Sequence, residues 1–439
     1  MNEFGKNTLA GLLADDPEME FRIKTNTELY RKGFGDIRLK YSDGTPVTRA
    51  EIRVKQTEHE FQFGANAFML GEFPTEEENR QYEEIFAGVF NTAVLPFYWK
   101  DLEPVDGQVR FRKNSPKIYR RPAPETGLEF CEKYNLTPKG HPLCWHDYWP
   151  DWVDKDPRKA MGRLERRFQE IAEFTAKRIP IWDVMNEAQT RDFLCKTHMP
   201  RFPRNYIEEI FQMAERYFPE ATLCYNDDCR WWCHQAEYSP VYLLVEKLKR
   251  NRCRVDALGM QFHMFEHHFP ELPRFFSPRH LYGCFDLYAE LNLRLIISEI
   301  SILGNDVYFG KGEGEVFQNI ATEKLYRLWF SHPAMSSIVW WNIVNNTSCS
   351  CVEEKFEAGI VKRDFTPRRA YNTLKRLIKE EWNTALTMDY EQEKINKFHG
   401  FYGDYDLVIR TDKGCFDRKI KLSRDSYNIF EITLEGGQK

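Results

Sequence analysis

Residues 181–187 read IWDVMNE, and residues 294–302 read RLIISEISI. Each is a short apolar run that carries one glutamate near its carboxyl end, Glu187 in the first and Glu299 in the second. Runs of this length and composition are typical of strands that are buried on both faces of a parallel sheet. A carboxylate inside such a strand is costly to desolvate unless it is paired or reaches water, so the two glutamates indicate a special role.

Six further runs of the same kind accompany these two, and longer stretches with helical periodicity separate them. In residues 163–177, for example, Leu164, Phe168 and Ile171 fall on one helical face. This repeated βα pattern predicts an α/β fold, a closed (β/α)8 TIM barrel, in preference to an open doubly wound sheet. The predicted strands are Phe61–Phe68, Phe90–Pro96, Thr137–Trp145, Ile179–Asn186, Ala221–Asn226, Val255–His263, Arg294–Ile302 and Ser337–Val344.

The two ends of the chain follow a different pattern, with strands but no alternating helices. Residues 36–56 alternate apolar and polar side chains on either side of Asp43-Gly44, which predicts a β-hairpin. Further strands are predicted at residues 405–410, 416–422 and 427–434, and we expect them to pair with the hairpin in a small accessory β module. Its role is either a structural buttress or a carbohydrate-binding module. The predicted division is an N-terminal extension at residues 1–60, the barrel at 61–384 and a C-terminal β-rich extension at 385–439.

The composition narrows the classes of partner and the compartment. Among 439 residues, 62 basic against 67 acidic side chains give a net charge of −5, so no nucleic-acid partner is expected. No stretch is long and apolar enough to predict a membrane span, and the N-terminus lacks the pattern of an export signal. The 11 cysteines are odd in number and irregularly spaced. These features favour a cytoplasmic protein, or a secreted one if a leader has been removed.

In a barrel of this type, chemistry takes place at the carboxyl ends of the strands, where Glu187 and Glu299 both lie. Glycoside hydrolysis needs such a pair, because one carboxyl group protonates the leaving oxygen while the other attacks the anomeric carbon. Each glutamate could instead belong to a buried structural ion pair, and its position in the sequence would be the same. The positions of the two glutamates leave both interpretations open.

Several short sequence motifs, in a fixed order, resemble glycoside hydrolase family 10, the xylanase family with a (β/α)8 barrel. The resemblance extends over roughly residues 61–380. The motifs are FQFGANAF at 61–68, FNTAVLPFYWKDLEP at 90–104, GHPLCWHDYWPDWV at 140–153, WDVMNEA at 182–188, LCYND at 223–227, VDALGMQFH at 255–263, IISEISI at 296–302, and WWNIVN at 340–345 followed by RDFTPRRAYNTL at 363–374.

The resemblance implies a retaining hydrolase of β-1,4-linked xylo-oligosaccharide or xylan, with an oligosaccharide or glycoside as its partner and no cofactor. Glu187 matches the family's acid/base and Glu299 its nucleophile. The matched substrate-binding positions are His141, Trp145, Asn186, Gln261, His263 and Trp341. No metal is expected, although His263, His267 and His268 cluster in the sequence with Glu266.

Three departures from the family pattern affect the sugar pocket and not the two carboxylates. The family's Glu-Asn-x-x-Lys-Trp element is shortened to residues 95–99, with Tyr98 at the position of the lysine. Ser301 replaces an aspartate, and Asn342 and Asn345 replace a glycine and an aspartate. Two alternatives therefore stay open: an exo-acting β-glycosidase on a decorated oligosaccharide or plant glycoconjugate, and a catalytically silent sugar-binding protein.

Overall fold

The structure is a computed structural model that describes residues 1–189, 199–228, 231–232, 239–348 and 351–435. The chain divides into two units. The barrel unit comprises Met1–Asp15, Phe63–Trp329 and Ala334–Thr373, and the second unit comprises Asp16–Gln62, Phe330–Pro333 and Leu374–Lys439. Four segments therefore group differently from the predicted division: residues 1–15 belong with the barrel, and residues 61–62, 330–333 and 374–384 belong with the second unit.

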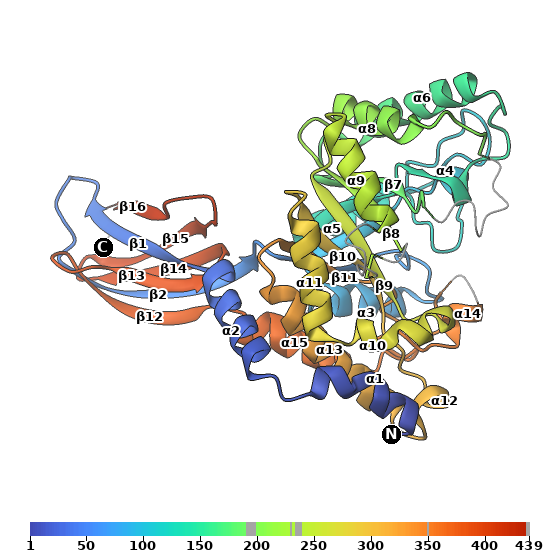
Figure 1. Ribbon diagram of the computed structural model, residues 1–439. Coiled ribbons are helices and arrows are strands. Elements are labelled where there is room, and N and C mark those ends of the chain that lie inside the picture. The colour runs from blue at the N-terminus through green and yellow to red at the C-terminus, as the bar shows by residue number, and fades with distance from the viewer. Residues whose placement is uncertain (190–198, 229–230, 233–238, 349–350, 436–439) are drawn as a thin grey trace. The chain divides into compact units, whose positions relative to one another are not determined.

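The barrel prediction is confirmed. One sheet has the order β5-β4-β3-β11-β10-β9-β8-β7-β6, and a further pairing of β5 with β7 closes it, with helices outside the strands (Figure 1). The short β6 adds to the end of β7 beside the closing pair. The strands are β3 (Gln62–Asn66), β4 (Thr92–Pro96), β5 (Thr137–His141), β6 (Cys144–Trp145), β7 (Ile181–Asn186), β8 (Thr222–Asp227), β9 (Ala257–His263), β10 (Arg294–Ser301) and β11 (Met335–Trp340).

Several of the helices between these strands begin with a capping side chain. The Asp156 side chain accepts hydrogen bonds at the start of α6, and its buried Leu164, Phe168 and Ile171 form the predicted apolar face. The helices are α1 (Glu3–Leu13), α3 (Glu76–Ala87), α4 (Trp99–Leu102), α5 (Pro124–Tyr134), α6 (Pro157–Thr175), α8 (Tyr206–Tyr217), α9 (Pro240–Arg250), α10 (Leu272–Phe275), α11 (Pro278–Ala289), α12 (Asp306–Phe309), α13 (Gly314–Ser331), α14 (Cys351–Glu354) and α15 (Arg369–Arg376), with short 3-10 helices η1 (His146–Tyr148) and η2 (Glu266–Glu271) and a π-helical turn η3 (Leu377–Glu381).

Two tryptophans next to the site motifs serve packing behind the strands. Trp182 of β7 packs edge-on against Phe97, with ring centroids 4.7 Å apart, and a Cβ at Gly140 would collide with its ring. Trp340 of β11 is buried and donates a hydrogen bond of 3.1 Å from its indole nitrogen to the carbonyl oxygen of Ala358. Alternation along each strand thus turns these rings away from the neighbouring residues that face the barrel interior.

The second unit is a β-sandwich preceded by helix α2 (Pro17–Arg31). One sheet has the order β13-β1-β16 and the other the order β12-β2-β14-β15. Both sheets combine strands from the two ends of the chain. The strands are β1 (Lys32–Tyr41), β2 (Arg49–His59), β12 (Ala385–Glu391), β13 (Lys397–Phe401), β14 (Gly403–Thr411), β15 (Gly414–Leu422) and β16 (Ile429–Leu434).

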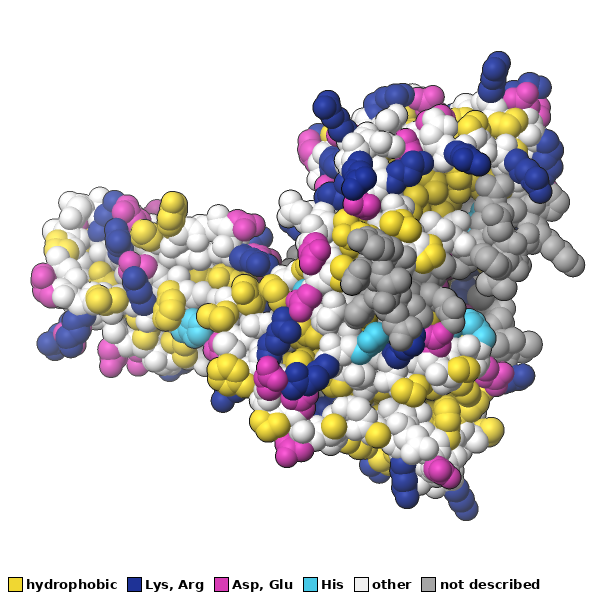
Figure 2. All heavy atoms as spheres, in the orientation of Figure 1, with side chains coloured by type: hydrophobic (Ala, Val, Ile, Leu, Met, Phe, Trp, Pro, Cys, Tyr) yellow, Lys and Arg dark blue, Asp and Glu magenta, His cyan; other side chains and the backbone are white. Residues whose placement is uncertain are grey.

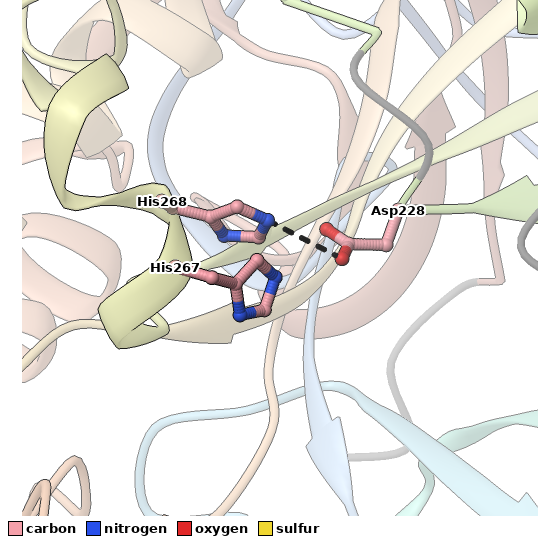
Figure 3. A group of neighbouring side chains, drawn as sticks. All are labelled: Asp228, His267 and His268. Atoms are coloured by element: carbon pink, nitrogen blue, oxygen red, sulfur yellow. Dashed lines mark ion pairs between the residues drawn. The ribbon is translucent and has the colours of Figure 1, made fainter. Parts of the chain in front are cut away.

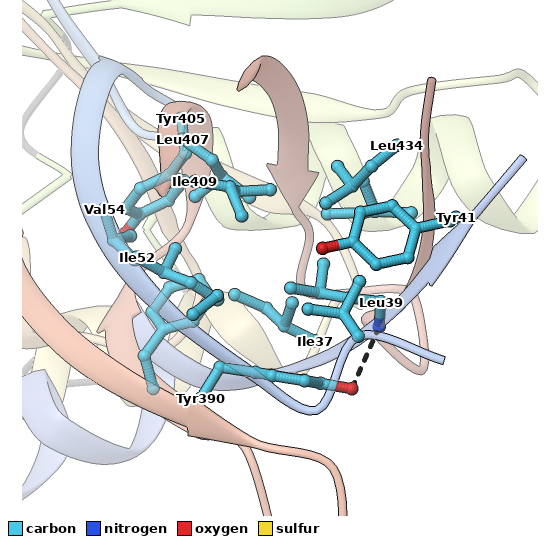
Figure 4. Packing of buried hydrophobic residues seen from close by; sticks show 14 of the residues in the cluster. Ile37, Leu39, Tyr41, Ile52, Val54, Tyr390, Tyr405, Leu407, Ile409 and Leu434 are labelled. Atoms are coloured by element: carbon cyan, nitrogen blue, oxygen red, sulfur yellow. Dashed lines mark hydrogen bonds between the residues drawn. The ribbon is translucent and has the colours of Figure 1, made fainter. Parts of the chain in front are cut away.

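The predicted hairpin at residues 36–56 is wrong, because β1 and β2 lie in different sheets. Their alternating apolar residues face a common core from opposite sides, as the side chains of Ile37, Leu39, Ile52 and Val54 show in Figure 4. The Tyr390 hydroxyl accepts a hydrogen bond of 3.2 Å from the backbone N–H of Leu39 across this core. Alternation specifies that one face of each strand is buried, but it does not specify which strand lies beside it.

Acidic and basic side chains are interspersed over the face seen in Figure 2, in keeping with the nearly balanced composition. Within the part of the chain that the structure describes, no helix combines the length and apolar character needed to cross a membrane.

Candidate active site

Glu187 lies directly after β7, at the carboxyl end of the strand. Its backbone has a φ of +52°, and its N–H donates a hydrogen bond of 2.8 Å to the carbonyl oxygen of Asn226. Its carboxylate Oε1 accepts a hydrogen bond of 2.9 Å from Nε2 of Gln261 in β9. A left-handed backbone is unfavourable for a residue with a Cβ, and such conformations persist where the surrounding structure holds them, often at functional sites.

The environment of Glu187 keeps its carboxyl group protonated at neutral pH. Burial and, next, the negative charge of Glu299 raise its pKa from 4.5 to about 8, while the Gln261 hydrogen bond opposes the rise. The charges of Asp227 and Asp147 act in the same direction as that of Glu299. A carboxylic acid with a pKa near the working pH is suited to donate a proton in a reaction and to take it back later.

Glu299 lies within β10 and is held by hydrogen-bond donors on both oxygens. Nδ2 of Asn226 lies 2.8 Å from Oε1, and Nε2 of His263 lies 3.2 Å from Oε2. The other ring nitrogen of His263, Nδ1, lies 2.8 Å from the hydroxyl oxygen of Ser301. In the β9–β10 pairing, Glu299 is opposite Gln261, the residue that binds Glu187. The two glutamates therefore face the same end of the barrel.

Asn226 is a site residue to which the sequence analysis assigned no role, although it lies in the LCYND motif. Its Nδ2 donates to Oδ1 of Asn186 at 2.7 Å as well as to Glu299, so one amide links two predicted site residues. A Cβ at Gly259 on the neighbouring strand would collide with Oδ1 of Asn226. Nδ2 of Asn186 is buried and makes no hydrogen bond with a described residue, so this donor remains for a ligand.

His141 ends β5, and its ring is oriented by a buried carboxylate. Nδ1 of His141 lies 2.8 Å from Oδ2 of Asp183, which also forms an ion pair with Lys139. Burial by itself would raise the pKa of Asp183, but the positive charge of Lys139 and the hydrogen bond of His141 lower it to about 2. Since an ionised carboxylate accepts the hydrogen of Nδ1, the Nε2 nitrogen of His141 is the one that is available to a ligand.

Aromatic rings surround the two glutamates. Trp341 follows β11, and its ring lies edge-on to His141 at 5.3 Å and to His263 at 6.3 Å between centroids. Trp145 lies 6.5 Å from His141 and 5.6 Å from Tyr98. All eight predicted site residues are thus linked through direct contacts or one shared neighbour, and flat apolar faces of this kind suit the CH groups of a sugar ring.

The three departures from the family pattern have visible structural roles. Tyr98 is buried against Tyr148, and the Arg121 guanidinium lies 3.9 Å from the centroid of its ring. Asn342 accepts a hydrogen bond of 2.8 Å from Arg120 beside Trp341. Asn345, in contrast, accepts one of 2.8 Å from the backbone N–H of Gly359 and so fixes a loop. Ser301, as described above, occupies the position beside His263.

Two aspartates at the end of β8 were also missed by sequence reasoning. Asp227 accepts a hydrogen bond of 3.2 Å from the backbone N–H of Gln189 and another from the Tyr225 hydroxyl. Burial raises the pKa of Asp228 well above 3.8, and the charges of Glu187, Asp227 and Glu299 raise it further. Among the described residues, this end of the barrel therefore brings together Glu187, Glu299, Asp227 and Asp228, of which the two glutamates were identifiable from the strand motifs.

Sequence comparison places this site among known proteins. The sequence model of glycosyl hydrolase family 10 matches residues 57–377. Endo-1,4-beta-xylanase B of Thermotoga neapolitana is 25% identical over 274 residues, which cover 58% of this chain and 74% of that enzyme. The anti-sigma-I factor RsgI6 of Acetivibrio thermocellus is 24% identical over 402 residues, which cover 90% of this chain but only 47% of that protein. The chain thus spans about half the length of this second relative.

Comparison of structures gives a consistent result for the fold. The crystal structure of native xylanase 10B from Thermotoga maritima superposes with a TM-score of 0.57 and 21% identity, covering 73% of this chain and 96% of that one. Because the sequence model of the family extends over well over half of the residues, the chain belongs to glycosyl hydrolase family 10.

Proposed function

We propose that this chain hydrolyses β-1,4-linked xylo-oligosaccharide or xylan by a retaining, two-step displacement. One observation carries the proposal: two carboxyl groups at the same end of the barrel have different surroundings. Glu187 is half-buried, and desolvation together with nearby negative charge raises its pKa to about 8, whereas Glu299 accepts hydrogen bonds on both oxygens from Asn226 and His263. Environments that separate two carboxyl groups in this way assign one as the acid and the other as the nucleophile.

In the first step, an oxygen of Glu299 bonds to the anomeric carbon as the glycosidic bond breaks. The proton of Glu187 moves to the departing oxygen, so the leaving sugar departs as a neutral alcohol. In the second step, the ionised Glu187 takes a proton from a water molecule whose oxygen attacks the anomeric carbon. The ester bond to Glu299 breaks, and both carboxyl groups return to their starting states.

The surrounding residues support binding of the sugar whose bond is cleaved. Nδ2 of Asn186 is the buried donor without a partner among the described residues, so it can donate to a ring hydroxyl. His141 presents Nε2, since Nδ1 is engaged by Asp183. Trp341 provides a flat apolar face next to both histidines of the site. The names of the xylanase relatives support a xylose-based substrate.

The test uses purified protein, xylo-oligosaccharides and an aryl β-xyloside, with the anomer of the first product read by NMR. A β-anomer is expected from retention, and an α-anomer would contradict the two-step mechanism. Glu299→Gln should lower turnover on all substrates by more than about 10³-fold. Glu187→Gln should cost roughly 10²–10⁴-fold on oligosaccharides but far less on an aryl xyloside, whose leaving phenol needs little protonation. Glu266→Gln, at an exposed position after β9, is the matched control.

A second candidate is sugar recognition without turnover. This candidate is favoured by the relative RsgI6, because that protein is named as an anti-sigma factor and not as an enzyme. Its alignment covers 90% of this chain. The product assay and a binding measurement by calorimetry together separate the two functions. A recognition protein binds xylo-oligosaccharides but releases no product, and Glu187→Gln leaves that binding unchanged. The raised pKa of Glu187 favours catalysis, because binding alone does not need a carboxyl group with a raised pKa.

A further inference from the structure

Three side chains at the barrel mouth that the proposed mechanism does not use converge on one point. Asp228 directly follows β8, and His267 and His268 are neighbours in the 3-10 helix η2 (Figure 3). One ligand atom from each of the three lies within 4.8 Å of the other two. Asp228 is half-buried, His268 is buried and His267 is exposed, so the group opens to solvent on the side of His267.

The hydrogen bonding of His268 fixes which ring nitrogen faces the aspartate. Nδ1 lies 2.9 Å from the carbonyl oxygen of His263, which can only accept, so Nδ1 carries the hydrogen. In a neutral ring, Nε2 then presents its lone pair to Oδ2 of Asp228, which lies 3.7 Å away. Two such acceptors are stabilised by a positive charge between them, which a proton or a bound metal ion can supply. A backbone carbonyl that orients the far nitrogen of a histidine is also the usual arrangement around a metal ligand.

Asp228 supplies a second, independent observation. Its Oδ1 is buried and makes no hydrogen bond with any residue of the described ranges. Burial and the negative charges of Glu187, Asp227 and Glu299 make the ionised form of this carboxyl group unfavourable in the absence of a cation. A bound cation would satisfy the oxygen and offset the accumulated negative charge.

The group differs from the cluster that the sequence suggested. Glu266 is not part of it, because its carboxylate accepts a hydrogen bond of 2.9 Å from the Tyr308 hydroxyl. His263 is not part of it either, because its two ring nitrogens face Ser301 and Glu299. Asp228 takes their place, although it lies about forty residues earlier in the sequence than the two histidines.

We infer that Asp228, His267 and His268 bind a divalent transition-metal ion of the Zn²⁺ type, with a fourth position open to water. Two imidazole nitrogens and one carboxylate oxygen favour zinc over magnesium or calcium, which prefer all-oxygen sites. Bonds of about 2.0–2.2 Å place tetrahedral ligands roughly 3.3 Å apart. The Asp228–His268 distance of 3.7 Å is close to this value, and the ligand atom of the exposed His267 lies within 4.8 Å of both other ligand atoms.

The test titrates the full-length, metal-stripped protein with Zn²⁺ in competition with a chromophoric chelator, and it does not depend on glycosidase activity. His267→Ala and Asp228→Asn should each weaken Zn²⁺ binding at least about tenfold, because even the loss of an outer hydrogen-bond partner commonly costs 10–100-fold. The exposed His399→Ala, in the second unit, is the control and should not change the affinity.

Two outcomes would overturn the inference: wild-type protein that does not bind Zn²⁺, and equal affinities in wild type, His267→Ala and Asp228→Asn. Because the chain has 11 cysteines, Co²⁺ is titrated in parallel. A spectrum with d–d bands but without thiolate charge transfer is expected, whereas thiolate bands would place the metal elsewhere. His267 is exposed, so His267→Ala keeps the test decisive if Asp228→Asn does not fold.

Discussion

Replacing Glu187 with glutamine should stabilise the barrel unit, and the gain should grow with pH. The wild-type carboxyl group ionises near pH 8 in the folded protein and near pH 4.5 in the unfolded chain. Between these values only the unfolded state loses the proton, so the wild-type free energy of unfolding falls as the pH rises. Glu187→Gln carries no titrating group at this position, and its amide oxygen can still accept the hydrogen bond from Gln261.

The size of the effect follows from the displaced pKa. A change from 4.5 to about 8 corresponds to at most about 5 kcal/mol at roughly 1.4 kcal/mol per pH unit. The Glu187 side chain is half-buried and not sealed from solvent, so water and local relaxation reduce this to about 2 kcal/mol. The advantage of Glu187→Gln should therefore increase by about 2 kcal/mol between pH 5 and pH 9.

The assay is denaturant unfolding followed by tryptophan fluorescence, since all tryptophans except Trp382 lie in the barrel unit. Glu290→Gln, at the exposed end of α11, is the matched control and should show no such trend. A stability difference between Glu187→Gln and wild type that stays constant from pH 5 to pH 9, or that shrinks, would refute the assignment of a strained, protonated Glu187.

Three further predictions address the reaction and the second unit. The kcat/KM for a xylo-oligosaccharide, whose leaving group needs protonation, should fall as the pH rises through about 8, because Glu187 loses the proton that it must donate; a basic limb centred below pH 6 in the pH–rate profile would contradict this. Asn226→Ala should lower kcat by about 10²-fold in steady-state assays, because it removes a donor to Glu299 and leaves Asn186 unoriented; an unchanged kcat would exclude that role. Leu407→Ala, in the fully buried core of the sandwich, should cost about 2–5 kcal/mol in hydrogen-exchange protection of that unit while leaving kcat unchanged; protection equal to wild type would argue against the described core.

The barrel was predictable because its signal is local. Each buried strand is a short apolar run that can be recognised without reference to its partners, and the helices between them carry their own periodicity and caps. The second unit was less predictable. In β1 and β2 the same alternation suits a hairpin or two facing sheets, and the choice is made by contacts of Leu39 and Ile52 with strands at the far end of the chain.

The site likewise has features that the local sequence predicts and features that depend on contacts between distant strands. The positions of Glu187 and Glu299 at strand ends were readable from the sequence alone, as were the motifs of the family. The amide of Asn226 that joins Glu299 to Asn186 was not, nor was the approach of Asp228 to His268, because each contact forms only when distant strands become neighbours.

The sequence by itself determined the order of the elements and the kinds of side chain that each strand end presents, because burial and backbone preference act over a few residues. Only the tertiary structure decided which of these side chains meet and how each is charged. The pKa of Glu187 illustrates the reason: it depends on desolvation and on the charge of Glu299, and both arise only once the barrel has closed.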